Sequence, residues 1–168
     1  MKTALALAAL LAASPALGAS LLDKAKKAAG KSAGARVEAE VNKQLLAESR
    51  KHQCAFLVDS DVLQPGCDAK AARLRDAIAQ AKQKLAKVGL QGVKFEVSGH
   101  TDSSGNPAHN RELSERRAQV IRRELLRKGV PAEEVVAVGK GSDEPLVKPD
   151  DTPAKKARNR RYEIRVRL

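Results

Sequence analysis

The sequence predicts an α/β fold, a two-layer sandwich in which helices pack on one face of a mixed four-stranded sheet. Short segments typical of strands alternate along the chain with longer segments of helical periodicity, in the order β-α-β-α-β-β. The 168 residues leave room for one domain and accessory segments. Because no further long helix follows to cover a second sheet face, two layers are the natural packing.

The N-terminus has the pattern of a leader for export. Met1-Lys2-Thr3 carries a positive charge, residues 4–13 are all apolar, and small residues follow up to Ala19. These features predict a secretory signal peptide over residues 1–19. The apolar run is much shorter than the roughly 20 residues that span a bilayer, and no later segment is more apolar. We therefore expect an exported chain with no transmembrane segment after cleavage, and no lipid anchor, since no cysteine lies at the junction.

The composition indicates an anionic partner. The formal net charge is +12, and the only aromatic residues are Phe56, Phe95 and Tyr162. Nucleic acid, acidic lipid headgroups and the carboxylates of the cell wall would all attract such a protein. Export and the shortage of aromatic stacking platforms argue against nucleic acid.

Residues 20–50 are rich in Ala, Lys and Glu and are interrupted by Gly30 and Gly34. Glycines fray helices, so this composition predicts a basic segment followed by a helix from about residue 35 to 49 with a narrow apolar stripe. We expect a basic helical spacer, able to bind an envelope protein partner, and a separate domain over residues 51–168 that folds without it.

Cys54 and Cys67 are the two cysteines of the chain. In an oxidising compartment an even count favours a disulfide, which would close a short loop and stabilise the domain by ~3 kcal/mol. Two buried thiols are the alternative. No nearby ligand completes a metal site, and we expect neither a metal nor a cofactor.

Three strands and two helices should build the domain before its last strand. Residues 53–58 form a short apolar run that predicts a first strand, and residues 68–88 carry apolar positions at helical spacing. Residues 93–97 alternate as a half-buried strand does. A second helix over residues 110–128 and a short strand over residues 135–138 follow.

The last expected strand covers residues 162–166, where Tyr162, Ile164 and Val166 alternate with charged residues. The stretch from residue 139 to 153, rich in Gly and Pro, is expected to be a loop.

Three separated motifs carry the functional signal. They are Gly99-His100-Thr101-Asp102-x-x-Gly105, Asn110-x-x-Leu113-Ser114-x-x-Arg117-Ala118 and Asn159-Arg160-Arg161. In order and spacing, the segment from Gln53 to Val166 resembles the OmpA-like peptidoglycan-binding domain. The resemblance implies a non-catalytic protein that links an envelope component to the cell wall, in the periplasm and at or near the outer membrane of a Gram-negative bacterium.

The resemblance also implies a role for each motif residue. The ligand would be the diaminopimelate of the stem peptide, whose far end displays an ammonium and a carboxylate on one carbon. Asp102 would bind the ammonium and Arg117 the carboxylate. Asn110 would orient the ligand or its loop, Thr101 and Leu113 would line the pocket, and Arg160 would border it.

The residues themselves support part of this assignment. Asp102 follows a half-buried strand, in a polar loop suited to tight turns. Arg117 falls within the apolar arc of the second helix, where a buried guanidinium needs an anion. The alternative is an arginine whose charged end reaches past the edge of the core to water.

Catalysis finds no support in the residues. His100 and His109 lie near Asp102, but no serine or cysteine forms a nucleophile motif with them and no HExxH spacing is present. Two other functions remain open: a periplasmic adaptor acting through protein contacts of residues 20–50, and a hydrolase of wall peptides.

Overall fold

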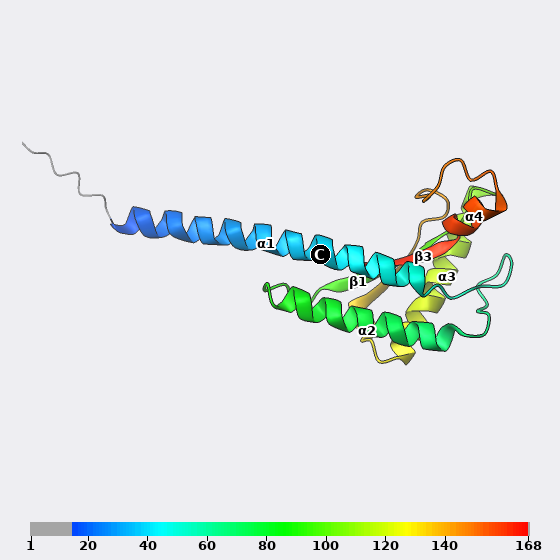
Figure 1. Cartoon of the computed structure of the whole chain (residues 1–168), viewed down its shortest axis with the longest axis horizontal. Helices are drawn as coiled ribbons and strands as arrows, with labels where there is room; N and C mark the ends of the chain where they lie inside the picture. Colours follow the sequence, from blue (N-terminus) through cyan, green and yellow to red (C-terminus); the bar gives the residue numbers. More distant parts are fainter. Residues whose placement is uncertain (1–14, 168) are drawn as a thin grey trace, which may run out of the picture.

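The structure, a computed structural model, describes residues 15–167 (Figure 1). Its elements are α1 (Pro15–Lys51), α2 (Cys67–Ala86), β1 (Lys94–His100), α3 (Pro107–Arg127), the 3-10 helix η1 (Ala132–Glu134), β2 (Val135–Gly139), α4 (Pro153–Asn159) and β3 (Arg161–Arg167). The leader expected over residues 1–19 falls largely on residues 1–14, outside the described residues. Within residues 15–167, no helix combines the length and the apolar character that a membrane span requires.

The sheet has three strands in the order β2-β1-β3, so the prediction of four strands is wrong. It is mixed as expected, because β1 runs parallel to β2 and antiparallel to β3. The segment expected as the first strand makes only an isolated bridge between Phe56 and Leu63. It folds back on itself, with the Leu57 N–H donating to the Val62 carbonyl at 2.9 Å.

Gln53 explains why this segment does not become a fourth strand. Its side-chain amide donates to the Tyr162 carbonyl at 2.8 Å and accepts from the Tyr162 N–H at 3.1 Å. A side chain thus takes the backbone groups of β3 that a neighbouring strand would have used.

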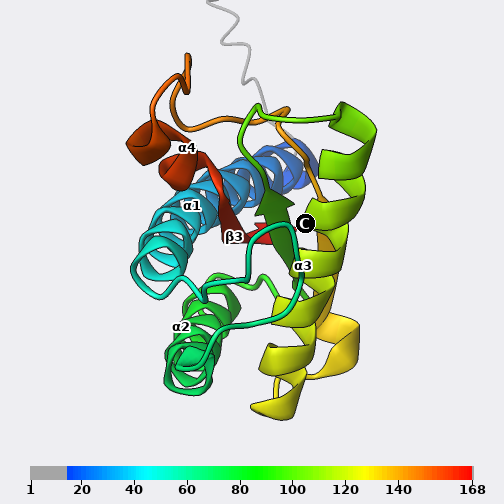
Figure 2. The same cartoon turned by 90° about the vertical axis from the view of Figure 1, so that its right-hand side faces the viewer.

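One face of the sheet is apolar and is covered by helices. Figure 2 shows α1, α2 and α3 set around β1 and β3. Gly99 of β1 and Gly139 of β2 allow α3 to approach closely, since a Cβ at either position would overlap the backbone of α3. The buried apolar residues of the sheet, of α2 and of α3 include Leu74, Ile78, Leu85, Phe95, Val97, Ile121, Leu125, Val135, Ile164 and Val166.

The second half of α1 belongs to this core, which the spacer prediction did not anticipate. The helix runs without a break through Gly30 and Gly34, and Figure 1 shows its first half extending past the rest of the domain. Val41 and Leu45 are buried in the same core cluster as the sheet. The narrow apolar stripe therefore has a partner, and a domain boundary after residue 50 would cut through the packing.

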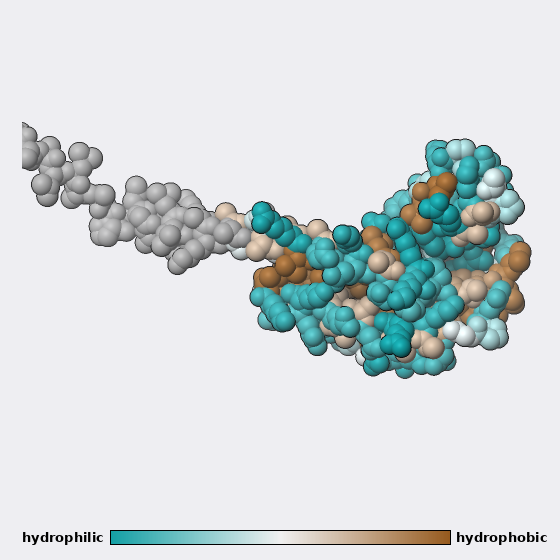
Figure 3. Space-filling model, in the orientation of Figure 1, coloured by the Kyte–Doolittle hydropathy of each residue, from teal (hydrophilic) through white to brown (hydrophobic). Residues whose placement is uncertain are grey.

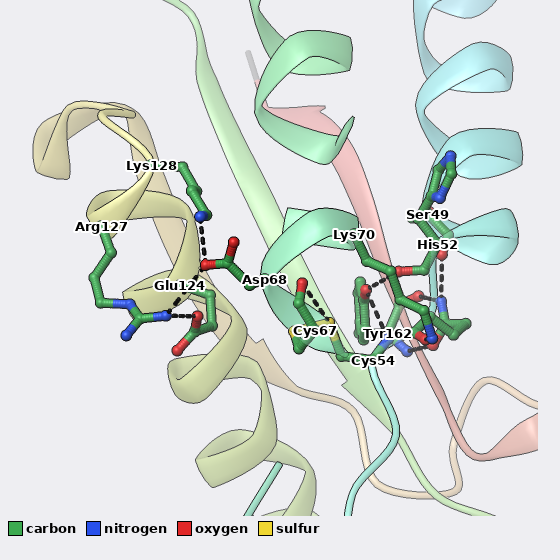
Figure 4. The surroundings of a disulfide bond; sticks show 11 residues. Ser49, His52, Cys54, Cys67, Asp68, Lys70, Glu124, Arg127, Lys128 and Tyr162 are labelled. Carbon is green, nitrogen blue, oxygen red and sulfur yellow. Dashed lines mark hydrogen bonds and ion pairs between the residues drawn. A yellow bond between two sulfur atoms is a disulfide. The ribbon is translucent and has the colours of Figure 1, made fainter. Parts of the chain in front are cut away.

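Cys54 and Cys67 are disulfide-bonded with their Cα atoms 5.0 Å apart, as predicted. Figure 4 shows how polar contacts fix the chain beside this bond. Tyr162 donates its hydroxyl hydrogen to the His52 carbonyl at 2.5 Å and accepts from the Cys54 N–H at 3.1 Å. Burial raises the pKa of Tyr162, so its hydroxyl remains a donor. The segment that follows α1 is thereby held against both β3 and α2.

The opposite face of the sheet carries a buried charge cluster centred on Glu163, which we call the Glu163 cluster. The carboxylate is 0% exposed and pairs with Arg50 at 2.8 Å, Arg161 at 2.9 Å and Arg165 at 2.8 Å. Burial alone would raise its pKa, but the three arginines lower it to about 2. Glu163 is therefore ionised and fully paired.

Candidate ligand-binding site

A cavity of about 710 Å³ opens where β1 ends. Its walls come from the chain before α2, the loop after β1, the first half of α3 and the junction of α4 with β3. All six residues that the motifs identified line it: Thr101, Asp102, Asn110, Leu113, Arg117 and Arg160. The fold thus brings residues up to 59 positions apart into one concave site, the arrangement in which ligands usually bind.

Asp102 lines the cavity as an ionised acceptor. It is 9% exposed, and its Oδ2 accepts from Arg160 Nη1 at 2.7 Å while its Oδ1 accepts from the Ser104 N–H at 2.9 Å. Burial would raise the pKa of Asp102, but the bonds from Arg160 and Ser104 outweigh it and hold the pKa below its usual value. Asp102 therefore offers negative charge to the cavity.

Asn110 holds the loop that carries Asp102. Its side-chain Nδ2 donates to the Ser104 carbonyl at 2.8 Å and to the Asp102 carbonyl at 3.5 Å. The loop meets α3 through Asn106, whose Oδ1 accepts from the Ala108 N–H at 2.8 Å in an N-cap. Asn110 thus orients the loop.

Arg117 brings a positive charge whose hydrogen bonds go only to neutral groups. Its Nε donates to the Ser60 carbonyl at 2.8 Å and its Nη2 to the Leu57 carbonyl at 3.3 Å, and its guanidinium lies 5.1 Å from the centre of the Phe56 ring. Within residues 15–167 no carboxylate forms an ion pair with it. Burial lowers its pKa, against the attraction of Asp59, but an arginine remains charged at neutral pH.

A further wall of the cavity is the segment from Ala55 to Asp59, which the sequence did not identify as part of a site. This segment begins the turn closed by the bridge between Phe56 and Leu63, and three of the four large apolar side chains exposed among the described residues, Leu57, Val58 and Val62, belong to that turn. Figure 3 shows an apolar patch at the end of the domain away from the projecting half of α1, where Figure 1 places this turn. The charged groups therefore lie beside an apolar rim.

Two buried polar atoms beside the cavity have no hydrogen-bond partner among the described residues, Thr101 Oγ1 and His100 Nδ1. Burial, followed by the charge of Arg161, lowers the pKa of His100 to about 4, so the ring is neutral at neutral pH. His109 instead contacts Asp59 at the surface, 2.7 Å from its carboxylate. The two histidines thus lie in different surroundings.

Two features near the site were not predicted from the sequence. The expected loop before the last strand contains α4, whose start is capped by Thr152 and followed by Pro153. Asn159 of the third motif does not line the cavity: its Oδ1 accepts from the Leu146 and Val147 N–H groups at 2.8 and 3.0 Å. The Thr-Pro pair was the signal for the helix start.

The similarity of the chain to known proteins agrees with this fold. A family model described as the OmpA family matches residues 56–160. Outer membrane porin F of Pseudomonas fluorescens is 36% identical over 111 residues, which cover 66% of this chain and 31% of that protein. Outer membrane protein A of Bordetella avium is 33% identical over 111 residues, covering 66% of this chain and 52% of that protein. The chain thus spans about a third and about half of these two curated relatives.

Solved structures show the same fold. The C-terminal domain of Helicobacter pylori MotB matches with a TM-score of 0.54 and 25% identity, over 68% of this chain and 82% of that one. The peptidoglycan-associated lipoprotein of Burkholderia pseudomallei matches with a TM-score of 0.55 and 24% identity, over 68% of this chain and 89% of that one. Since the family model covers more than half of the sequence, the chain belongs to the OmpA family.

Proposed function

We propose that this protein binds peptidoglycan without catalysis, by holding the zwitterionic end of diaminopimelate in the stem peptide. The observation that carries the proposal is Arg117, a half-buried cation whose hydrogen bonds go only to carbonyls, in the same cavity as the ionised Asp102. Membership of the OmpA family and the fold shared with a peptidoglycan-associated lipoprotein support it.

Arg117 binds the ligand's carboxylate, because two of its nitrogens are anchored to Ser60 and Leu57 and the guanidinium is held in place. Asp102 binds the ammonium. Each charge-assisted bond contributes about 1.5–3 kcal/mol. An ammonium and a carboxylate on the same carbon satisfy both residues at once, whereas a simple acid satisfies only Arg117.

The other four residues shape the cavity around these charges. Arg160 keeps the Asp102 carboxylate oriented through their 2.7 Å contact and shares it with the incoming ammonium. Asn110 fixes the loop. Thr101 supplies a hydroxyl without a partner in the described chain, and Leu113, with the apolar rim, contacts the methylene groups of the ligand.

Wall binding would place the protein in the periplasm, close to the outer membrane, and would link another envelope component to the wall. The half of α1 that extends beyond the domain in Figure 1 is the surface available for that component. The same observation supports the second candidate function, an adaptor that acts mainly through residues 20–50.

Co-sedimentation of the mature protein with purified sacculi tests the proposal. We expect binding that free diaminopimelate displaces and that Asp102→Ala abolishes. Asp143→Ala is the matched control, because Asp143 is an exposed carboxylate that pairs with Arg111 and does not line the cavity. A diffuse attraction between a basic protein and an acidic polymer predicts the opposite sign, since both variants remove a negative charge and would bind more strongly. Retained binding by a folded Asp102→Ala protein contradicts the site.

A further inference from the structure

The loop between β2 and α4 contains a buried carboxylate that the ligand contacts above do not use. Asp150 is 8% exposed. Its Oδ2 accepts from the Ser103 N–H and from Asn159 Nδ2, each at 2.9 Å, and its Oδ1 accepts from the Ser103 hydroxyl. No cation pairs with it among residues 15–167, so its charge is balanced by three neutral donors.

These donors belong to the immediate neighbours of two site residues. Ser103 follows Asp102 in the chain, and Asn159 precedes Arg160. One carboxylate therefore binds the loop that presents Asp102 and the turn that presents Arg160, and these two side chains meet at 2.7 Å. Asn159 is itself fixed by the backbone of the Asp150 loop, through Leu146 and Val147.

We infer that Asp150 is a positioning residue, which holds Asp102 and Arg160 in the mutual geometry that the ligand's ammonium requires. The inference rests on the proposed function for the identity of the ligand. The carboxylate accepts from a backbone N–H and an amide NH₂ through Oδ2 and from a hydroxyl through Oδ1. A neutral amide there can keep its oxygen toward the first two donors, with the Ser103 hydroxyl turned to accept from its NH₂, but it lacks the charge that strengthens these bonds, so the link between the two loops weakens.

Asp150→Asn tests this with little change of shape, and Asp151→Asn is its matched control. Asp151 is the adjacent residue, its side chain is 59% exposed, and it pairs with Lys155 at 2.7 Å. Both variants raise the net charge by one, so they alter long-range attraction to the wall alike. We expect Asp150→Asn to weaken binding of a soluble diaminopimelate-containing peptide about tenfold. Asp151→Asn should leave the affinity within about twofold.

A second readout separates positioning from a loss of stability. Carbon NMR of the side-chain carboxyl groups reports the titration of Asp102 in the folded protein without any ligand. In the wild type and in Asp151→Asn, its pKa should lie below the usual value, as the contact with Arg160 requires. In Asp150→Asn it should move upward, because the Arg160 contact is no longer held. A residue that only stabilised the fold would not move this titration.

Ser103→Ala keeps the protein testable if Asp150→Asn does not fold, because it leaves the Asp150 carboxylate and the Ser103 N–H in place. We expect a smaller change in the same direction. Where Asp150→Asn does fold, combining it with Ser103→Ala should cause no further loss. Equal affinities and an unchanged Asp102 titration in the Asp150 and Asp151 variants would overturn the inference while leaving the proposed function intact. Absence of peptide binding by the wild type would overturn the proposed function, and the Asp102 titration would still decide the role of Asp150.

Discussion

Two clusters of arginine and carboxylate lie close together in this protein and are organised in opposite ways. In the Glu163 cluster three arginines surround one carboxylate that is entirely buried. In the cavity Asp102 is paired with Arg160, while the hydrogen bonds of Arg117 go only to carbonyls. The Glu163 carboxylate is 0% exposed and does not line the cavity, so no ligand reaches it. Asp102 and Arg117 both line the cavity, and this difference in access separates a structural charge cluster from a binding site.

Removal of α1 should have the largest effect on stability. This helix contributes Arg50 to the Glu163 cluster, whereas it supplies no residue to the cavity. A protein starting at Lys51 loses Val41 and Leu45 from the core, each worth about 1.5–3 kcal/mol on burial. That is a large share of the 5–15 kcal/mol, roughly, that stabilises a domain. We expect a strongly lowered or non-cooperative thermal transition.

A protein starting at Ala35 is the control for this truncation, since it keeps the buried stripe of α1 and loses the projecting half. It should melt as the untruncated protein does. Equal melting temperatures for the two truncated proteins would show that α1 is dispensable, as the residue composition alone had suggested.

The next largest effect is expected from Glu163→Gln, which leaves three arginines around a neutral amide. Removing one partner of a buried ion pair lowers the free energy of unfolding by about 3 kcal/mol. Urea unfolding measures this, with Glu96→Gln as the control, because Glu96 contacts Arg167 only at 3.9 Å on a more exposed part of the sheet. A change no larger than that of the control would mean that the cluster contributes little to stability.

The Glu163 cluster should also make the protein sensitive to acid. The folded pKa of Glu163 is lowered to about 2 from the usual 4.5, so the stability it provides is complete above pH 4.5 and is lost as the pH falls toward 2. Burial, followed by the charge of Arg161, lowers the pKa of His100 to about 4 from 6.5, so stability also falls between those values. Urea unfolding from pH 7 to 2 should show both losses. Glu163→Gln should make the lower one smaller without removing it, because the pKa of Asp150 is also lowered to about 2 by its hydrogen bonds.

The sequence anticipated the α/β class, the disulfide and two helices, expected over residues 68–88 and 110–128 and found over 67–86 and 107–127, because each depends on local periodicity or on residue count. It was wrong about the fourth strand, since nothing local reveals that the Gln53 side chain occupies the edge of β3. It also predicted a spacer where the second half of α1 packs into the core, since a narrow apolar stripe does not reveal that β3 and α2 lie against it.

For the site, the motifs identified six residues that line one cavity, because their spacing reflects a family pattern. They did not identify Asp150 or the wall from Ala55 to Asp59. Asp150 contacts Ser103 and Asn159, which lie 47 and 9 positions away in the sequence, and a single sequence does not reveal such non-local contacts.

The smallest expected effect on stability, and the most direct test of the account, comes from Arg117→Gln. The loss of its bonds to Ser60 and Leu57 should cost only about 1–2 kcal/mol, so the protein stays folded. Arg116→Gln is the matched control, because Arg116 is the adjacent arginine of α3 and pairs with Glu112 at 3.5 Å outside the cavity.

Calorimetric titration with a soluble diaminopimelate-containing peptide compares the two variants at equal net charge. We predict that Arg117→Gln weakens binding more than tenfold and that Arg116→Gln stays within about twofold of the wild type. Equal affinities for the two folded variants would contradict the claim that the charge of Arg117 binds the ligand.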